Sequence, residues 1–219
     1  MAILPRKGKD NSAEGIAERR ERAKRLRREL LYIPNLLTYA RIVAIPAVVL
    51  LMFRADPKSS YMATVLYVVA STTDYFDGWL ARRMGQTSLL GVFLDPLADK
   101  LFVMAALVML VHLGRLPAWV VVLLLAREMS ITGLRAIASS EGMNIAAGFS
   151  GKMKTAFQMV ALCFLLMHYE YEVSFIFFST TLDTHAIGVA IVYISLFFSL
   201  YSAAEYFASF VSHLVDEPS

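Results

Sequence analysis

Six apolar stretches dominate the chain and restrict it to a fold built from membrane-spanning helices. Each is about 20 residues long, the length that a helix needs to cross the roughly 30 Å hydrocarbon core of a bilayer. Hydrophobic residues make up 58% of the 219 residues, against about 45–50% in an ordinary globular protein. The stretches cover residues 34–53, 60–83, 90–113, 116–139, 153–170 and 186–210. We therefore expect an all-α integral membrane protein, a six-transmembrane-helix bundle.

The flanks of these stretches divide the chain into three parts. Residues 1–33 form a basic arm, residues 34–210 form the transmembrane domain, and residues 211–219 form a short tail. Apolar residues recur in the arm at helical spacing, opposite a cluster of Arg and Lys: Ile16, Ala23, Leu26, Leu30 and Ile33. This pattern predicts a juxtamembrane amphipathic helix on an anionic membrane surface. A solvated basic arm without membrane contact is the alternative, and no aromatic residues interleave with the charges as nucleic-acid binding would favour.

The distribution of positive charge predicts an orientation. Cytoplasmic loops of membrane proteins carry an excess of Lys and Arg, and residues 1–33 contain ten of them. The link at residues 170–185 has three acidic residues and no Lys or Arg. Both termini are therefore expected in the cytoplasm. The arm has no apolar signal core and too many acidic residues for a transit peptide, so a bacterial cytoplasmic membrane is the expected location.

Four carboxylates lie within the second and third apolar stretches. Ionisable groups at membrane depth are costly and by default mark a functional site. Asp74 and Asp77 share a face of one helix, and Asp95 and Asp99 share a face of the next. Two such helices side by side would point four carboxylates into one small volume. Charges this close require compensation, and carboxylate oxygens suit Mg²⁺, Mn²⁺ or Ca²⁺.

Small and basic residues accompany these aspartates. Gly78 and Gly91 remove side chains where a helix or ligand must approach closely. Arg82 supplies a planar donor fork suited to a phosphate. The stretch therefore predicts a metal–diphosphate site at a membrane edge. The alternative is that these polar residues only cap and pair two ordinary membrane helices.

A polar stripe begins the first apolar stretch. Asn35, Thr38 and Arg41 recur at every third residue, which places them on one helix face. We expect this face to border a nucleotide and its phosphates. Capping by Asn35, with Arg41 extending to the membrane surface, is the alternative.

Four cations gather in the fourth and fifth apolar stretches and the link between them. They are Arg127, Arg135, Lys152 and Lys154. Cations beside a metal site imply a second anion, which favours a phosphate-bearing acceptor. Anchoring at the cytoplasmic surface is an alternative for Lys152 or Lys154, and Glu128 is placed to pair with one of the cations. Lys100 follows Asp99 in sequence and is expected on another face, in a structural role.

The aspartate stretch resembles a known family. The pattern D-x2-D-G-x2-A-R-x8-G-x3-D-x3-D is the signature of the CDP-alcohol phosphatidyltransferases, and every position is filled. The residues that fill it are Asp74, Asp77, Gly78, Ala81, Arg82, Gly91, Asp95 and Asp99. The segments Ala126-Arg127-Glu128, Leu134-Arg135 and Gly151-Lys152-x-Lys154-Thr155, with Gln158, resemble the branch that makes phosphatidylglycerophosphate. The resemblance extends from about residue 33 to residue 207 and leaves out the arm.

This resemblance implies a reaction and a role for each residue. The phosphatidyl group of CDP-diacylglycerol would pass to sn-glycerol 3-phosphate with release of CMP, in a homodimer with two Mg²⁺ or Mn²⁺ ions. The implied metal ligands are Asp74, Asp77, Asp95 and Asp99, with Asp99 also taking the proton from the attacking hydroxyl. The implied CDP-lipid residues are Asn35, Thr38, Arg41, Gly78, Ala81, Arg82 and Gly91. The implied acceptor-phosphate residues are Arg127, Arg135, Lys152 and Lys154.

Other functions remain compatible with the sequence. Within the family the acceptor could be phosphatidylglycerol, serine or an inositol phosphate, although serine would not call for so many cations. Outside the family, a divalent-cation transporter could also use carboxylates inside the membrane. A transporter would not need the glycines, Arg82 or the cationic segments, and it would release no CMP.

Overall fold

A computed structural model describes residues 20–21, 32–84, 89–143, 148–174 and 179–216. These residues form six long helices: α2 (Ile33–Phe53), α3 (Pro57–Met84), α4 (Leu89–His112), α5 (Ala118–Ser140), α6 (Phe149–Met167) and α7 (Thr184–Asp216). Each of the six predicted stretches lies mainly on one of these helices. The amphipathic helix predicted in the arm lies outside the described residues, except for a helical pair at Arg20 and Glu21.

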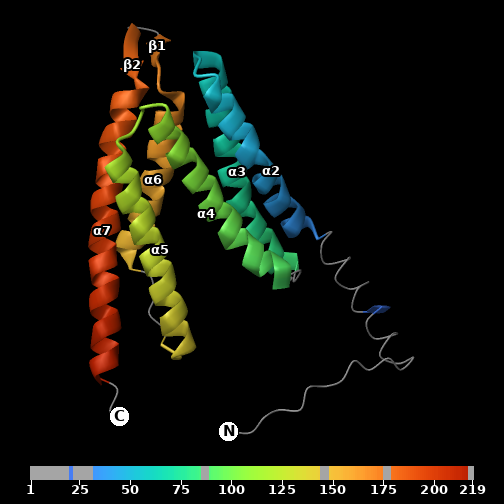
Figure 1. Cartoon of the computed structure of the whole chain (residues 1–219). Coiled ribbons are helices and arrows are strands. Elements are labelled where there is room, and N and C mark those ends of the chain that lie inside the picture. The colour runs from blue at the N-terminus through green and yellow to red at the C-terminus, as the bar shows by residue number, and fades with distance from the viewer. Residues whose placement is uncertain (1–19, 22–31, 85–88, 144–147, 175–178, 217–219) are drawn as a thin grey trace.

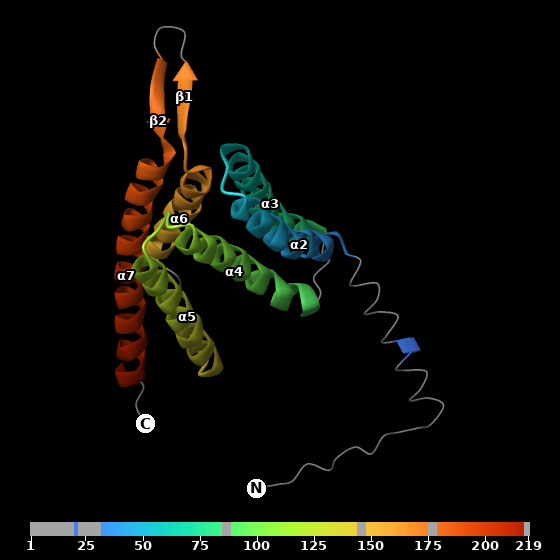
Figure 2. The ribbon, with the colours of Figure 1, turned by 45° about the horizontal axis from the view of Figure 1, so that its top comes forward.

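Helix α4 lies between two groups of helices (Figures 1 and 2). It packs against α2 on one side and against α5 and α6 on the other. Helices α6 and α7 pack together closely, and α6 also contacts α3. One apolar core joins all six helices and includes Met52, Tyr67, Phe102, Leu124, Leu165 and Val192. The bundle therefore forms around α4 and α6, each of which contacts several partner helices.

The link between the last two helices is a β-hairpin. Strand β1 (Glu170–Ser174) pairs antiparallel with β2 (Ser179–Asp183), and Glu170 lies opposite Asp183. The prediction treated this segment as the longest link of an all-helical chain. Its β-branched residues favour extended backbone, but strands of five residues are too short to stand out in a chain dominated by apolar stretches of helix length.

Arg115 ties helices together at the hairpin end of the bundle. Its side chain is only 3% exposed. Nη1 donates a hydrogen bond to the carbonyl oxygen of Leu166 at 3.0 Å, and Nη2 donates to the hydroxyl of Ser60 at 3.1 Å. The guanidinium also lies over the ring of Tyr169, 5.6 Å from its centre. Because a buried cation must be compensated, these contacts fix the ends of α3 and α6 to the link between α4 and α5.

Helices α6 and α7 approach each other closely at Gly188. A Cβ atom at this position would lie 2.8 Å from Cγ and 2.9 Å from the backbone nitrogen of Leu165. Small residues permit such close contact between membrane helices. A larger residue at position 188 must therefore push the two helices apart.

We expect Gly188→Ala to destabilise the protein. The added methyl group would overpack the contact with Leu165, and we expect it to lower the free energy of unfolding by about 1–3 kcal/mol. Thermal unfolding of the purified protein in detergent measures this change. Gly133→Ala is the matched control, because a Cβ on Gly133 of α5 meets nothing within 4 Å. Equal unfolding temperatures for the two variants would contradict the tight contact.

Candidate active site

The polar stripe on α2 faces α4 inside the bundle. Arg41 is 2% exposed, and its Nη1 lies 3.2 Å from Oδ1 of Asp95, which is 40% exposed. Thr38 donates a hydrogen bond from Oγ1 to the same carboxylate oxygen at 3.3 Å. Asn35 is also buried. The stripe thus meets one of the predicted metal ligands.

The alternative interpretation of this stripe is wrong. Arg41 does not extend to the surface, because its side chain is buried against α4. Asn35 is not the N-cap residue of α2, which is Tyr32, and its side chain is buried. The stripe therefore contributes to the interior of the site.

The other two aspartates lie on α3. Their backbone is helical. The side chains of residues 74–84 lie outside the described residues, and this range includes the predicted site residues Asp74, Asp77, Gly78, Ala81 and Arg82. Asp77 precedes the end of α3 by seven residues, and Asp95 follows the start of α4 by six. At 1.5 Å per residue, both lie about 10 Å along their helices from the α3–α4 link.

This level placement suits the predicted metal set. Helices α3 and α4 run in opposite directions from their short link (Figure 1), and Gly91 lies in the first turn of α4. Asp95 and Asp99 are the two predicted ligands with described side chains. No group of three His, Cys, Asp or Glu side chains with metal-binding geometry occurs among the described residues, a set that leaves out the two aspartates of α3.

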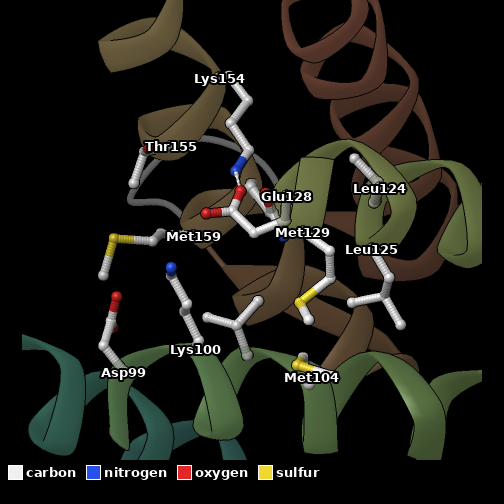
Figure 3. Close-up of a pocket in the computed structure, with 12 residues that line it drawn as sticks. Asp99, Lys100, Met104, Leu124, Leu125, Glu128, Met129, Lys154, Thr155 and Met159 are labelled. Atoms are coloured by element: carbon white, nitrogen blue, oxygen red, sulfur yellow. Dashed lines mark hydrogen bonds and ion pairs between the residues drawn. The ribbon is translucent and has the colours of Figure 1, made fainter. Parts of the chain in front are cut away.

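Asp99 opens into a cavity of about 190 Å³ between α4, α5 and α6, which we call the Asp99 cavity. Figure 3 shows Asp99 and Lys100 rising from α4 toward Glu128 and Lys154. The polar lining residues are Asp99, Lys100, Glu128, Lys154, Thr155 and Gln158. The apolar lining residues are Val103, Met104, Leu124, Leu125, Met129 and Met159. The cavity thus combines titratable groups with an apolar wall.

An ion pair between α5 and α6 lies in this cavity. Lys154 donates a hydrogen bond from Nζ to Oε2 of Glu128, and Nη1 of Arg127 lies 3.4 Å from the same oxygen. The backbone carbonyl of Lys154 accepts a hydrogen bond from Ser195 of α7 at 3.0 Å. Glu128 therefore pairs with the cations, as the sequence suggested, and Lys154 is held at both its side chain and its backbone.

Lys100 lines the same cavity, contrary to the expectation that it would lie on another face. Its Nζ donates a hydrogen bond to Oγ1 of Thr132 on α5 at 2.8 Å. One position of offset rotates a side chain by about 100° on a helix, but a long lysine can still reach a cavity bounded by three helices. Sequence periodicity alone did not reveal this placement.

Two of the predicted acceptor-binding cations lie in a second cavity of about 170 Å³ between α5, α6 and α7, which we call the Arg135 cavity. Arg127 donates from Nε to the carbonyl oxygen of Ser199 at 3.0 Å and from Nη2 to the hydroxyl of Ser202 at 2.5 Å. The guanidinium of Arg135 lies over the ring of Tyr206, 5.6 Å from its centre.

The predicted cations therefore do not all face one cavity. Arg127 and Arg135 line the Arg135 cavity, Lys154 lines the Asp99 cavity, and the exposed Lys152 is in the lining of neither. The ion pair between Arg127 and Glu128 connects the two cavities. Helix α5 separates these groups because its successive residues point to different neighbours.

The sequence prediction assigned no role in the site to the polar residues that α7 contributes. Ser199 and Ser202 bind Arg127, and Glu205 accepts a hydrogen bond from Ser150 of α6. Ser195, Ser199 and Ser202 are all buried. Their spacing of four and three residues places them on one face of an otherwise apolar helix, and this periodicity could have revealed them.

Comparison with known proteins places this geometry in context. Residues 31–206 match the family model described as CDP-alcohol phosphatidyltransferase. The chain is 37% identical over 190 residues to the CDP-diacylglycerol–glycerol-3-phosphate 3-phosphatidyltransferase of Bacillus subtilis, covering 80% of this chain and 93% of that protein. It is 34% identical over 191 residues to the proteins of the same name from Escherichia coli K12 and Shigella flexneri serotype 5b, covering 84% of this chain and 98% of each of those proteins.

The matched region contains all the residues that line the Asp99 cavity and all but Ser209 of those that line the Arg135 cavity. It also contains the complete aspartate pattern on α3 and α4. The chain belongs to the CDP-alcohol phosphatidyltransferase family.

Proposed function

We propose that this enzyme transfers the phosphatidyl group from CDP-diacylglycerol to sn-glycerol 3-phosphate, giving phosphatidylglycerophosphate and CMP. The observation that carries the proposal is similarity over most of the chain to transferases named for these two substrates. The Asp99 cavity supports it, because lysines lie beside a predicted metal ligand there. A lipid donor and a small anionic acceptor both need a polar site within an apolar bundle.

The aspartates fit a divalent metal by their chemistry. Asp95 keeps a 40% exposed side chain while one of its oxygens accepts bonds from α2, and Asp99 is exposed to its cavity. Hard carboxylate oxygens of this kind suit Mg²⁺ or Mn²⁺, and we propose that Asp74, Asp77, Asp95 and Asp99 hold two ions. When bound, these ions neutralise the diphosphate and polarise the phosphorus under attack.

The protein's own residues then carry the proton and position the substrates. We propose that Asp99 accepts the proton from the attacking hydroxyl of glycerol 3-phosphate. The hydroxyl oxygen forms a bond to the phosphorus that bears diacylglycerol. The bond from that phosphorus to the bridging oxygen breaks, and CMP leaves with the electron pair.

The remaining predicted residues bind the two substrates in this proposal. Gly78, Ala81, Arg82 and Gly91 accommodate the CDP group, with Asn35, Thr38 and Arg41 at its border. Of the four predicted acceptor residues, Lys154 lines the Asp99 cavity and lies beside the acceptor's phosphate in this proposal. Arg127 and Arg135 line the neighbouring Arg135 cavity and Lys152 lines neither, so these three flank the acceptor site and do not enclose the phosphate.

We further propose that all six helices cross the membrane, with both termini in the cytoplasm. Among the described residues, the segments Asn35–Phe53 and Thr184–His213 are long and apolar enough to do so. The charges that interrupt α4 and α5 line the two cavities or, in the case of Asp95, pair with Arg41 of α2, so they do not argue against spanning. The homodimer implied by the family stays a prediction.

Cysteine labelling tests the proposed orientation. In a Cys163→Ser background, we expect a membrane-impermeant maleimide to label Glu172→Cys in intact bacteria, because β1 faces outward in this topology. Glu141→Cys, in the exposed link after α5, should be labelled only after the membrane is opened. The reverse pattern would invert the topology.

A CMP-release assay tests the proposed reaction. We expect purified protein in detergent, with CDP-diacylglycerol and Mg²⁺ or Mn²⁺, to release CMP with glycerol 3-phosphate and to stop when a chelator is added. Serine, inositol phosphate and phosphatidylglycerol serve as alternative acceptors. Release with one of these instead would keep the family chemistry but change the acceptor. Absence of release with every acceptor, in folded protein, would favour cation transport.

We expect Asp99→Asn to lower kcat by about 10²–10⁴-fold, because an amide cannot accept the proton of the attacking hydroxyl. Asp56→Asn is the control: Asp56 lies in the α2–α3 link, and its Oδ1 accepts a hydrogen bond from the backbone nitrogen of Ser59, which an asparagine oxygen can also do. Steady-state CMP release measures both variants. Full activity of Asp99→Asn would remove this residue as the proton acceptor.

A further inference from the structure

We infer that Lys100 binds the phosphate of the acceptor in the Asp99 cavity, a role that neither the family pattern nor the relatives' names assign to it. This inference rests on the proposed function, because the proposed acceptor, glycerol 3-phosphate, carries the phosphate that Lys100 would bind. It starts from the placement of Lys100 beside Asp99, where its side chain reaches the same cavity. Figure 3 shows its ammonium group between the Asp99 carboxylate and the Glu128–Lys154 pair.

The ammonium of Lys100 has a neutral partner. It donates a hydrogen bond to Oγ1 of Thr132 at 2.8 Å. That hydroxyl donates its own hydrogen to the carbonyl oxygen of Glu128 at 2.7 Å, which leaves a lone pair to accept from Lys100. Within the described part of the chain, the ion pairs are those of Arg41, Arg127 and Lys154, and none includes Lys100.

The other cations near this cavity are already engaged by the protein. Glu128 pairs with Lys154. Arg127 donates to Ser199, Ser202 and Glu128. A substrate anion that used either cation would compete with these contacts.

The two remaining cations lie elsewhere. Lys152 is exposed and lines neither cavity, and Arg135 lines the Arg135 cavity, where it stacks on Tyr206. Among the described residues of the Asp99 cavity, Lys100 is therefore the cation that forms no ion pair. A dianionic phosphate would gain a charge-assisted hydrogen bond there without breaking an ion pair.

The position of Lys100 also suits the reaction. It follows Asp99 directly on α4, so a phosphate bound to its ammonium holds the rest of a short alcohol near the Asp99 carboxylate. Thr132 of the neighbouring helix α5 accepts a hydrogen bond from the lysine and so holds its ammonium in place. Lys100 thus positions the acceptor, while Lys154 and Glu128 form the neighbouring wall.

Steady-state kinetics of Lys100→Gln test this inference. We expect the KM for glycerol 3-phosphate to rise about 10–100-fold, the range for a lost hydrogen bond to a charged group. The KM for CDP-diacylglycerol should change little, and Lys100→Arg should recover part of the loss. An unchanged KM for glycerol 3-phosphate in Lys100→Gln would overturn the inference.

Two matched variants separate binding from structure. Thr132→Val removes the hydroxyl partner but keeps the ammonium, so its KM should stay closer to that of the parent protein. If Lys100 only fastened α4 to α5, the two variants would have equal effects. Lys154→Gln leaves Glu128 without its main partner, so it should lower the unfolding temperature, whereas Lys100→Gln should not.

A binding measurement removes any dependence on turnover. Calorimetric titration of glycerol 3-phosphate into Asp99→Asn, with CDP-diacylglycerol present, should detect binding that is lost when Lys100→Gln is added. Retained binding in the double variant would overturn the inference.

The acceptor panel separates the two proposals. If a different phosphate-bearing alcohol releases CMP, the proposed acceptor is wrong, and Lys100→Gln should raise the KM for that alcohol instead. If an uncharged alcohol is the acceptor, Lys100 has no acceptor phosphate to bind, and both the proposed function and the inference are overturned. If glycerol 3-phosphate is the acceptor and Lys100→Gln leaves its KM unchanged, the inference fails and the proposed function stands.

Discussion

The cost of placing charge inside an apolar helix bundle governs the arrangement of this site. A charged group removed from water must be paired and hydrogen-bonded, or the fold loses several kcal/mol. The two most deeply buried ion-paired cations of the site, Arg41 and Lys154, meet this demand across helix boundaries. Arg41 of α2 meets Asp95 of α4, and Lys154 of α6 meets Glu128 of α5. The site residues therefore also connect the helices that carry them.

This double use explains why the cations differ in what they can do. Arg127 is bound by a carbonyl and a hydroxyl of α7, so much of its hydrogen-bonding capacity stabilises the α5–α7 contact. Lys154 is bound by a carboxylate. Because these cations already have partners within the protein, a new anion would have to compete with those partners. Among the described cations of the Asp99 cavity, Lys100 is held by a hydroxyl and by no carboxylate. Binding of a substrate anion to Lys100 would therefore break no ion pair.

The features that could be predicted from the sequence are those marked by a regular spacing of apolar or polar residues. Six apolar stretches of helix length predicted the helices, and the spacing of Asn35, Thr38 and Arg41 predicted their common face toward the site. The hairpin was missed because its strands are five residues long, far below the length of the stretches sought. The division into two cavities was missed because it depends on which neighbour each face of α5 meets, and this is a property of tertiary packing.

The hairpin end of the bundle carries several contacts that hold the helices together, and the other end carries the candidate site. At the hairpin end, buried Arg115 joins α3, α6 and the α4–α5 link, and Tyr169 donates a hydrogen bond to the carbonyl oxygen of Ala55. These contacts, with the close approach at Gly188, hold the helices together away from the aspartates. Because that end supplies much of the packing, the other end can keep a cavity and exposed carboxylates. This asymmetry suits the proposed reaction, in which a lipid donor and a small anionic acceptor meet at the end of the bundle that carries the aspartates.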